Sequence, residues 1–330
     1  MRRKSLAAVI LAFTGLIGSM IWSFLPSPLP PPTPWSAALP VASPPLSMAI
    51  FQLPTGTYQT PAALAFRGGS FFETRDFAST AVLLRHPKGD LLFDAGFGSA
   101  LDAHIATLPR FQRTPHNRGE SVRAQLAAIG YDFRALRGVV ITHSHWDHVS
   151  GLAELPAPVW MNAAEQHYAS EDHAVTRVFR SFSGLNIRSY GFEGPAYLGF
   201  PSSYDVWGDG SIVLVPAPGH TPGSIVAFIA LPTGKRYALI GDLTWQLEGV
   251  TARAERPLFM RVLADVDASE VRKNLLRIVA LAGRMEIIPA HDGRAYADLP
   301  RLHQTRLERV LRYIIRHAAG LLPSVGSPGR

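Results

Sequence analysis

From about Met48 onward, apolar residues occur in short runs that are separated by turn-forming residues. Each run holds three to six residues, is rich in valine, isoleucine, leucine or phenylalanine, and is bounded by glycine, proline or aspartate. Runs of this kind are typical of short β-strands. The predicted strands are Ala49–Leu53, Thr80–Arg85, Leu91–Phe93, Gly138–Ile141, Val159–Met161, Ile212–Val215, Ile225–Ala230, Tyr237–Ile240 and Glu286–Ile288.

Other stretches of the chain predict helices. These are Ser121–Ile129, Ala163–Ala169, Ala268–Leu281 and Leu302–His317. In the last of them apolar residues recur at helical spacing and arginines occupy the opposite face, which we interpret as solvated surface. The order of strands and helices favours two sheets covered by helices, in a layered α/β or α+β sandwich.

The N-terminal segment differs from the rest of the chain. A basic start, Met1 to Lys4, precedes an uncharged apolar run from Leu6 to Leu25. A run of about 20 apolar residues is long enough to cross a bilayer as a helix, and the apolar core of a signal peptide is usually shorter. We therefore predict that residues 1–25 are a membrane anchor, with a cleaved signal segment as the alternative. The basic flank indicates that the rest of the chain lies outside the cytoplasm.

Proline content marks a linker after this segment. Nine prolines occur between Pro26 and Pro45, and so many prolines favour an extended, semi-rigid chain over a helix or a sheet. We predict that residues 26–47 are a linker, that residues 48–322 are one domain, and that residues 323–330 are a C-terminal tail.

Composition narrows the chemistry that this domain can perform. With 330 residues, 47% hydrophobic and 17% charged, the chain is typical of a globular protein with a sizeable core. It has no cysteine, so disulfides, thiolate metal sites and a cysteine nucleophile are excluded, and a metal would have to use His, Asp or Glu. The net charge of +7 does not by itself argue for nucleic acid as a partner.

One stretch, "VVITHSHWDHVSG", concentrates metal-binding side chains. His143, His145, Asp147 and His148 lie within six residues, directly after the apolar run "GVVIT". Imidazole and carboxylate bind zinc and comparable first-row metals. Their position at the end of a predicted strand means that a rigid element would hold the ligands.

Three further segments place His or Asp just after an apolar run. His220 follows "IVLVPAPG", Asp242 follows "YALIG" and His291 follows "EIIPA". Proline and glycine beside these residues would fix the backbone. Seven ligands are too many for one tetrahedral ion, whereas two ions that share a carboxylate would use all of them.

Taken together, these motifs resemble the metallo-β-lactamase superfamily. They are "HSHWDH", "PGHTPGS", "LLFDAG", the late Asp242 and "PAHD", and the resemblance covers the chain from about Met48 to "PAHD". It implies an α+β fold, an αββα sandwich with a site for two metal ions at one edge. The ligands that it implies are His143, His145 and His220 for one ion and Asp147, His148 and His291 for the other, with Asp242 bridging. Asp94 of "LLFDAG" is expected to support the ligands without binding metal.

The resemblance also implies a metal-dependent hydrolase with zinc as the expected metal. Metal-bound hydroxide would attack the carbonyl of a small acyl ester or lactone. The positive centre would stabilise the oxyanion that forms, and Asp147 would act as general acid and base. Alternatives on the same fold are a thioester hydrolase and a phosphodiesterase or nuclease; a metal-stabilised binding module without turnover is a further alternative.

Within the superfamily, the chain is most similar to the N-acyl homoserine lactone lactonase-like hydrolases. In those lactonases a tyrosine that helps to hold the substrate oxygen lies three residues after the bridging aspartate, and this position is Trp245 here. We expect Trp245 either to donate a hydrogen bond to substrate or to pack in the core. Trp146 is expected beside the metals. Aromatic residues between Ser181 and Gly210 are expected to form an apolar wall that covers the substrate, with an insertion packed on the domain as the alternative. The expected partner is a small acyl substrate, and nucleic acid is not expected; the oligomeric state stays open.

Overall fold

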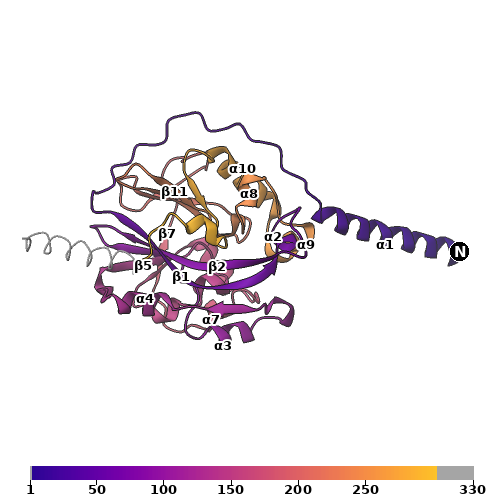
Figure 1. Ribbon diagram of the computed structural model, residues 1–330, viewed down its shortest axis with the longest axis horizontal. Helices are drawn as coiled ribbons and strands as arrows, with labels where there is room; N and C mark the ends of the chain where they lie inside the picture. The colour runs from indigo at the N-terminus through magenta and orange to yellow at the C-terminus, as the bar shows by residue number, and fades with distance from the viewer. Residues whose placement is uncertain (1, 303–330) are drawn as a thin grey trace, which may run out of the picture.

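The computed structural model describes residues 2–302, and its strands form two mixed sheets (Figure 1). The larger sheet has the order β4-β1-β2-β3-β5-β6-β7 and the smaller sheet the order β12-β11-β10-β9-β8. The strands are β1 Ala49–Pro61, β2 Thr74–Arg85, β3 Asp90–Phe93, β4 His116–Arg118, β5 Leu136–Val140, β6 Val159–Asn162, β7 Ile187–Tyr190, β8 Tyr204–Asp205, β9 Ile212–Pro216, β10 Ile225–Ala230, β11 Arg236–Leu239 and β12 Glu286–Ile288.

Helices connect and cover these strands. The α-helices are α1 Arg2–Phe24, α2 Ala62–Ala65, α3 Leu101–Ala106, α4 Val122–Ala128, α5 Trp146–Val149, α6 Ala163–Ser170, α7 Arg177–Ser181, α8 Glu248–Thr251, α9 Leu258–Ala264 and α10 Ala268–Leu281. The 3-10 helices are η1 Arg110–Gln112, η2 Phe133–Ala135, η3 Leu152–Glu154, η4 Gly241–Leu243 and η5 Gly293–Tyr296. The predicted helix Leu302–His317 and the predicted tail 323–330 lie almost entirely outside the described residues.

The two sheets pack face to face, and helices cover both outer faces. Side chains alternate along each strand, so Leu84 and Phe93 face the smaller sheet, whereas Leu83 and Leu92 face the helices. The outer face of the larger sheet packs against α3, α4 and α7, and that of the smaller sheet against α8 and α10 (Figure 1). This arrangement confirms the predicted α+β, αββα sandwich.

All nine predicted strands are present, but β1 is much longer than expected. It continues past Leu53 to Pro61 and pairs with β2 along its whole length, with a register shift between Pro54 and Gly56. The extension "PTGTYQTP" has no apolar run, so hydrophobic pattern alone could not reveal it. It brings Tyr58 to the metal-binding edge of the molecule, and three short strands, β4, β7 and β8, were likewise not predicted.

The N-terminal segment forms helix α1, which projects from the side of the domain near α2 and α9 (Figure 1). Among the residues that the structure describes, no helix is both long enough and apolar enough to cross a bilayer. The predicted membrane anchor is therefore not supported, and a location outside the cytoplasm stays a prediction.

The proline-rich residues 26–47 run in an extended path over the domain surface. Their backbone N–H groups at Leu29, Trp35 and Ser43 donate to carbonyl groups of the domain, at distances of 2.8–2.9 Å. The segment has the extended conformation that its prolines predict. It lies against the smaller sheet and α10, so it does not hold the domain at a distance. The domain boundaries themselves stay predictions.

Strand direction explains why the candidate ligands meet. Strands β3 and β5 are parallel, as are β11 and β12, and β9 runs in the same direction as β11 because both are antiparallel to β10. The carboxyl ends of β5, β9, β11 and β12 therefore lie at one edge of the sandwich. The predicted ligands follow these four ends within a few residues.

We expect Leu83→Ala to lower the free energy of unfolding by about 2–5 kcal/mol, because the substitution leaves a cavity in a fully buried part of the core. Urea denaturation of the zinc-loaded protein, followed by circular dichroism, measures the change. Leu46→Ala is the matched control, since Leu46 is 94% exposed and its loss should change stability by less than about 0.5 kcal/mol. Equal effects of the two substitutions would contradict the core assignment.

Candidate metal centre

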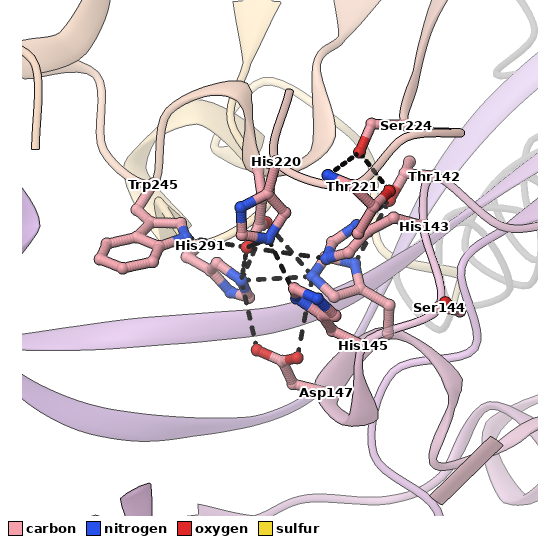
Figure 2. A network of polar contacts seen from close by, with 12 residues as sticks. Thr142, His143, Ser144, His145, Asp147, His220, Thr221, Ser224, Trp245 and His291 are labelled. Atoms are coloured by element: carbon pink, nitrogen blue, oxygen red, sulfur yellow. Dashed lines mark hydrogen bonds and ion pairs between the residues drawn. The ribbon is translucent and has the colours of Figure 1, made fainter. Parts of the chain in front are cut away.

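Seven buried side chains converge at the edge of the sandwich, and they are the seven that the sequence predicted (Figure 2). Their ligand atoms form three groups whose members lie within 4.8 Å of one another. The groups are His143, His145 and His220; His143, His148 and Asp242; and Asp147, His148 and His291. The four loops after β5, β9, β11 and β12 thus supply one compact centre.

Ring nitrogens in this centre face one another at short range. His220 Nε2 lies 3.0 Å from His145 Nδ1, and His148 Nε2 lies 3.3 Å from His291 Nε2. These contacts define two halves, with Asp147 beside the second half at 3.3 Å from His291 Nε2.

The carboxylate of Asp242 lies between the two halves. Its Oδ2 is 3.3 Å from His220 Nε2 and 3.9 Å from His143 Nε2. Its Oδ1 is 3.2 Å from His148 Nε2 and 3.0 Å from His291 Nε2. One carboxylate therefore contacts imidazoles of both halves, which is the position that a bridging ligand requires.

Two ligand atoms in this centre have no hydrogen bond among the described residues. They are His143 Nε2 and Asp242 Oδ1, and both are buried; the imidazole nitrogens near Asp242 Oδ1 contact it without hydrogen-bond geometry. A buried polar atom without a partner is costly. Divalent metal ions would satisfy both atoms, and nitrogen with carboxylate oxygen is a donor set that such ions prefer. The residues present therefore fit metal.

In three of the ligand imidazoles, the ring nitrogen that faces away from the centre contacts a supporting group. His148 Nδ1 lies 2.8 Å from Asp94 Oδ2, and His220 Nδ1 lies 3.1 Å from Asp265 Oδ1. His291 Nδ1 donates to the carbonyl of Ala78 at 2.8 Å, which leaves Nε2 with a free lone pair toward the centre. Such contacts fix ring orientation and tautomer, and Asp94 stands where the sequence predicted a supporting residue.

Glu165 links the two loops that carry four of the five histidines. Its Oε1 accepts from the backbone N–H and the hydroxyl of Ser144, both at 2.6 Å. Its Oε2 accepts from the hydroxyl of Thr221 at 2.6 Å and from the N–H of Gly223 at 3.2 Å. Burial raises the pKa of Glu165, and the hydrogen bonds from Ser144 and Thr221 oppose that rise.

Burial and neighbouring charges shift the pKa values of the ligands in opposite directions. Burial, reinforced by adjacent imidazoles, holds the pKa values of His143 and His145 well below their usual range. Burial alone would lower the pKa of His148, but the carboxylates of Asp94, Asp242 and Asp147 raise it well above its usual value. Burial alone would raise the pKa of Asp242, but the surrounding imidazoles hold it well below its usual range.

A cavity of about 580 Å³ opens beside the centre. Asp147, Asp242, His145 and His220 form its polar floor, and Trp146 lies on its wall as predicted. The remaining apolar lining is Leu64, Phe77, Ala174, Val175, Trp245, Phe259, Met260, Val262, Leu263, Ala264 and Val266. Most of this apolar wall therefore comes from α9 and the residues that follow it.

The prediction that residues 181–210 form an apolar wall beside the site is wrong. None of the described residues that line this cavity comes from that segment. Its aromatic rings pack elsewhere: Tyr190 stacks on Tyr204 at 5.3 Å and both pack with the core between the sheets. Aromatic content predicted an apolar surface but could not say which surface it would cover.

Trp245 acts on a ligand and packs in the core. Its Nε1 donates to Asp242 Oδ2 at 2.8 Å. Its ring contacts Phe77 edge-on at 5.7 Å, and the guanidinium of Arg256 lies 4.3 Å from the ring centre. Because indole has a single N–H, this hydrogen bond leaves none for substrate, which favours the packing alternative.

Sequence reasoning missed four contributors to the site, which are Glu165, Asp265, Arg256 and Tyr58. Glu165 has no motif around it, and Arg256, whose Nη1 pairs with Asp265 at 3.0 Å, lies in a segment without a recognisable pattern. Tyr58 lies on the unpredicted half of β1, and its hydroxyl donates to Asp147 Oδ2 at 3.1 Å. Burial and the carboxylates of Asp147 and Asp242 raise the pKa of Tyr58 well above its usual value.

Comparison with known proteins agrees with this geometry. The model of the metallo-beta-lactamase superfamily matches residues 74–291. A probable metallo-hydrolase of Mycobacterium tuberculosis is 30% identical over 234 residues, which cover 65% of this chain and 74% of the relative. The N-acyl homoserine lactonase AttM of Agrobacterium fabrum is 27% identical over 229 residues, which cover 66% of this chain and 82% of the relative.

Solved structures share the fold. A quorum-quenching N-acyl homoserine lactone lactonase matches with a TM-score of 0.60 at 17% identity, over 80% of this chain and 98% of that chain. The dizinc quorum-quenching lactonase AidC matches with a TM-score of 0.52 at 14% identity, over 75% of this chain and 88% of that chain. The chain thus belongs to the metallo-beta-lactamase superfamily and is a metal-dependent hydrolase.

We expect Glu165→Gln to weaken both the fold and metal binding. The amide places an NH2 group against a backbone N–H donor, of either Ser144 or Gly223, so one donor loses its acceptor. The free energy of unfolding should fall by about 1–3 kcal/mol, and zinc affinity by about 10–100-fold. Exposed Glu193→Gln is the control. Unchanged zinc affinity in Glu165→Gln, measured by chelator competition, would refute the role of Glu165.

We expect zinc affinity to fall as the pH decreases, because a proton on His148 competes with metal. The raised pKa of His148 extends this competition to higher pH than an ordinary imidazole would show. In the metal-free protein the same proton stabilises the fold at low pH, and this contribution is lost as the pH rises through the raised pKa.

The variant Asp94→Asn tests this pH dependence. It removes the carboxylate that raises the pKa of His148 most, so the midpoint of zinc affinity against pH should move to lower pH. Chelator competition from about pH 5 to about pH 9 measures both profiles. An identical midpoint in the two proteins would show that Asp94 does not control the proton on His148.

Proposed function

We propose that this chain is a dinuclear, zinc-dependent hydrolase that cleaves a small acyl ester or lactone. His143, His145 and His220 would hold one ion and Asp147, His148 and His291 the other. Asp242 would bridge them. The observation that carries the proposal is the position of the Asp242 carboxylate, which contacts imidazoles of both halves at 3.0–3.9 Å.

Bound divalent ions would make hydroxide available near neutral pH and would polarise the group under attack. Residues of the chain itself orient the reactants and transfer the proton. Asp147 lies at the floor of the cavity, where its carboxylate can orient the attacking water and pass a proton to the leaving alcohol. The supporting contacts to His148, His220 and His291 keep the ligand rings from turning while charge develops.

The cavity wall supports an acyl substrate. Phe259, Val262 and Leu263 of α9 line the cavity beside the polar floor, and Trp146 lies close to Asp147. An apolar wall with a few convergent polar groups suits a ligand with a hydrocarbon part and one polar group. Among the residues that the structure describes, none of those lining the cavity is a lysine or arginine that would pair with a phosphate. These features favour an uncharged ester or lactone over a phosphodiester.

The curated relatives named as N-acyl homoserine lactonases support the lactone assignment. A thioester differs from an ester in its leaving group and would fit the same floor and wall. An acyl lactone, an aryl ester, an acyl thioester and a bis-aryl phosphodiester are therefore the four substrates to compare.

We expect the full-length protein to bind about two zinc ions per chain and to hydrolyse the lactone or the ester. Elemental analysis measures the metal, and a pH-indicator assay measures turnover. Asp147→Asn should lower kcat by about 10²–10⁴-fold without unfolding the chain. Exposed Asp298→Asn is the matched control.

The outcomes separate the candidate functions. Cleavage of only the phosphodiester would show that the enzyme is a phosphodiesterase and not an acyl hydrolase. Cleavage of only the thioester would identify a thioesterase. Bound zinc without turnover of any of the four would refute the proposed reaction. Full activity after metal removal by a chelator would refute the metal-dependent mechanism.

A further inference from the structure

We propose that Tyr58 is a catalytic residue of this site, whose hydroxyl donates a hydrogen bond to the substrate oxygen on which negative charge develops. This inference rests on the proposed hydrolysis of an ester or lactone and adds a residue to it. The hydroxyl lies at the floor of the cavity, 3.1 Å from Asp147 Oδ2, on a strand that carries none of the seven candidate metal ligands.

The site needs a side-chain donor that the ligands themselves do not supply. The carboxylates accept hydrogen bonds, and the imidazoles direct their ring nitrogens toward one another or toward supporting groups. Trp245 has a single N–H, which it donates to Asp242. The hydroxyl of Tyr168 lies 3.5 Å from His145 Nε2, on the outer side of that ring, while the ring's Nδ1 faces His220. Tyr58 is therefore the phenol that lies beside the reacting end of the cavity.

Packing fixes the ring of Tyr58 and leaves its hydroxyl at the cavity. The ring lies 5.2 Å from Phe77 and 5.7 Å from Trp146, and it meets His291 edge-on at 5.5 Å. Pairing of β1 with β2 places Tyr58 opposite Phe77, and pairing with β4 places it opposite His116. A rigid ring on a paired strand holds a donor more precisely than a side chain on a loop does.

The hydroxyl can exchange its acceptor without movement of the ring. A phenol has one proton to donate and lone pairs to accept, and the proton turns about the bond between Cζ and oxygen. In the structure it points to Asp147 Oδ2. A substrate oxygen placed beside Asp147 would be within reach of the same proton. Since a phenol has a pKa near 10 or above, it stays protonated at neutral pH.

The reaction balances without transfer of the tyrosine proton. Oxygen of water forms a bond to the carbonyl carbon, and the C=O electron pair moves onto the carbonyl oxygen, where Tyr58 stabilises it. That pair then returns as the bond from carbon to the alcohol oxygen breaks. Of the two protons of water, one reaches the leaving alcohol through Asp147 and the other is released with the carboxylate product. Tyr58 donates a hydrogen bond throughout and keeps its proton.

Tyr58→Phe tests the proposal, because it removes the hydroxyl and keeps the ring that packs on Phe77 and Trp146. We expect kcat for the ester or lactone to fall by about 10²-fold, with KM changed by less than threefold, since the lost hydrogen bond forms chiefly in the transition state. Zinc content and thermal midpoint should match those of the wild type. Tyr131→Phe is the matched control, because it removes a phenol hydroxyl that donates to Asp90 at the other end of the larger sheet.

Calorimetric titration gives a readout that does not need turnover. The zinc-loaded proteins are titrated with an alkylphosphonate, whose tetrahedral anion resembles the oxyanion intermediate. Affinity in Tyr58→Phe should fall at least tenfold relative to the wild type and to Tyr131→Phe. Equal affinity, or a kcat within threefold of the wild type, would overturn the proposal.

Two further outcomes are distinguishable. Loss of zinc or of thermal stability in Tyr58→Phe would overturn the catalytic role and leave Tyr58 as a residue that positions Asp147. If the wild type cleaves no ester or lactone, the proposed function fails, and the phosphonate titration still decides whether Tyr58 binds a developing oxyanion.

Discussion

The carboxylate of Glu165 is the constraint on which the candidate metal centre depends, because it joins loops from the two different sheets. Ser144 follows β5 of the larger sheet, and Thr221 and Gly223 follow β9 of the smaller sheet, and all three donate to the two oxygens of Glu165. A Cβ at position 223 would lie 2.2 Å from the backbone nitrogen of Glu165, so only glycine permits this approach. His143, His145 and His220, which flank these donors in the sequence, are therefore held in fixed positions relative to one another.

The other half of the centre is fixed by contacts of the same kind. Asp94 follows β3 and accepts from the backbone N–H of Thr142 at 2.7 Å while it holds His148. Its φ of 56° is unusual for a residue other than glycine, and such strain is retained where the surrounding structure determines it. The carbonyl of Ala78 on β2 holds His291. His148 and His291 thus take their ring orientation from strands other than their own, which couples the site to the packing of both sheets.

Sequence motifs predicted the ligands and the supporting Asp94, but they did not predict Glu165 or Tyr58. His143, His220 and His291 each follow an apolar run, so position relative to a strand end was visible in the sequence. Glu165 and Tyr58 act through contacts between residues that are far apart along the chain, and such contacts leave no local pattern. The polar half of β1 carries Tyr58 because β2 and β4 pair with it, and no hydrophobic alternation marks that pairing. The apolar cavity wall that α9 supplies was also missed, because its contact with the site joins residues that are far apart along the chain.

The charge around the centre supports the proposed pair of ions and the proposed uncharged substrate. Five buried carboxylates and one guanidinium leave four negative charges, which two divalent ions neutralise. These groups are Asp94, Asp147, Glu165, Asp242, Asp265 and Arg256. Both oxygens of Glu165 accept from backbone N–H groups, as an ionised carboxylate does. A single ion would leave uncompensated negative charge in a dry interior, which is costly. With the charge balanced and the wall apolar, the negative charge that arises on the substrate oxygen requires a nearby donor, and this requirement gives the hydroxyl of Tyr58 its importance.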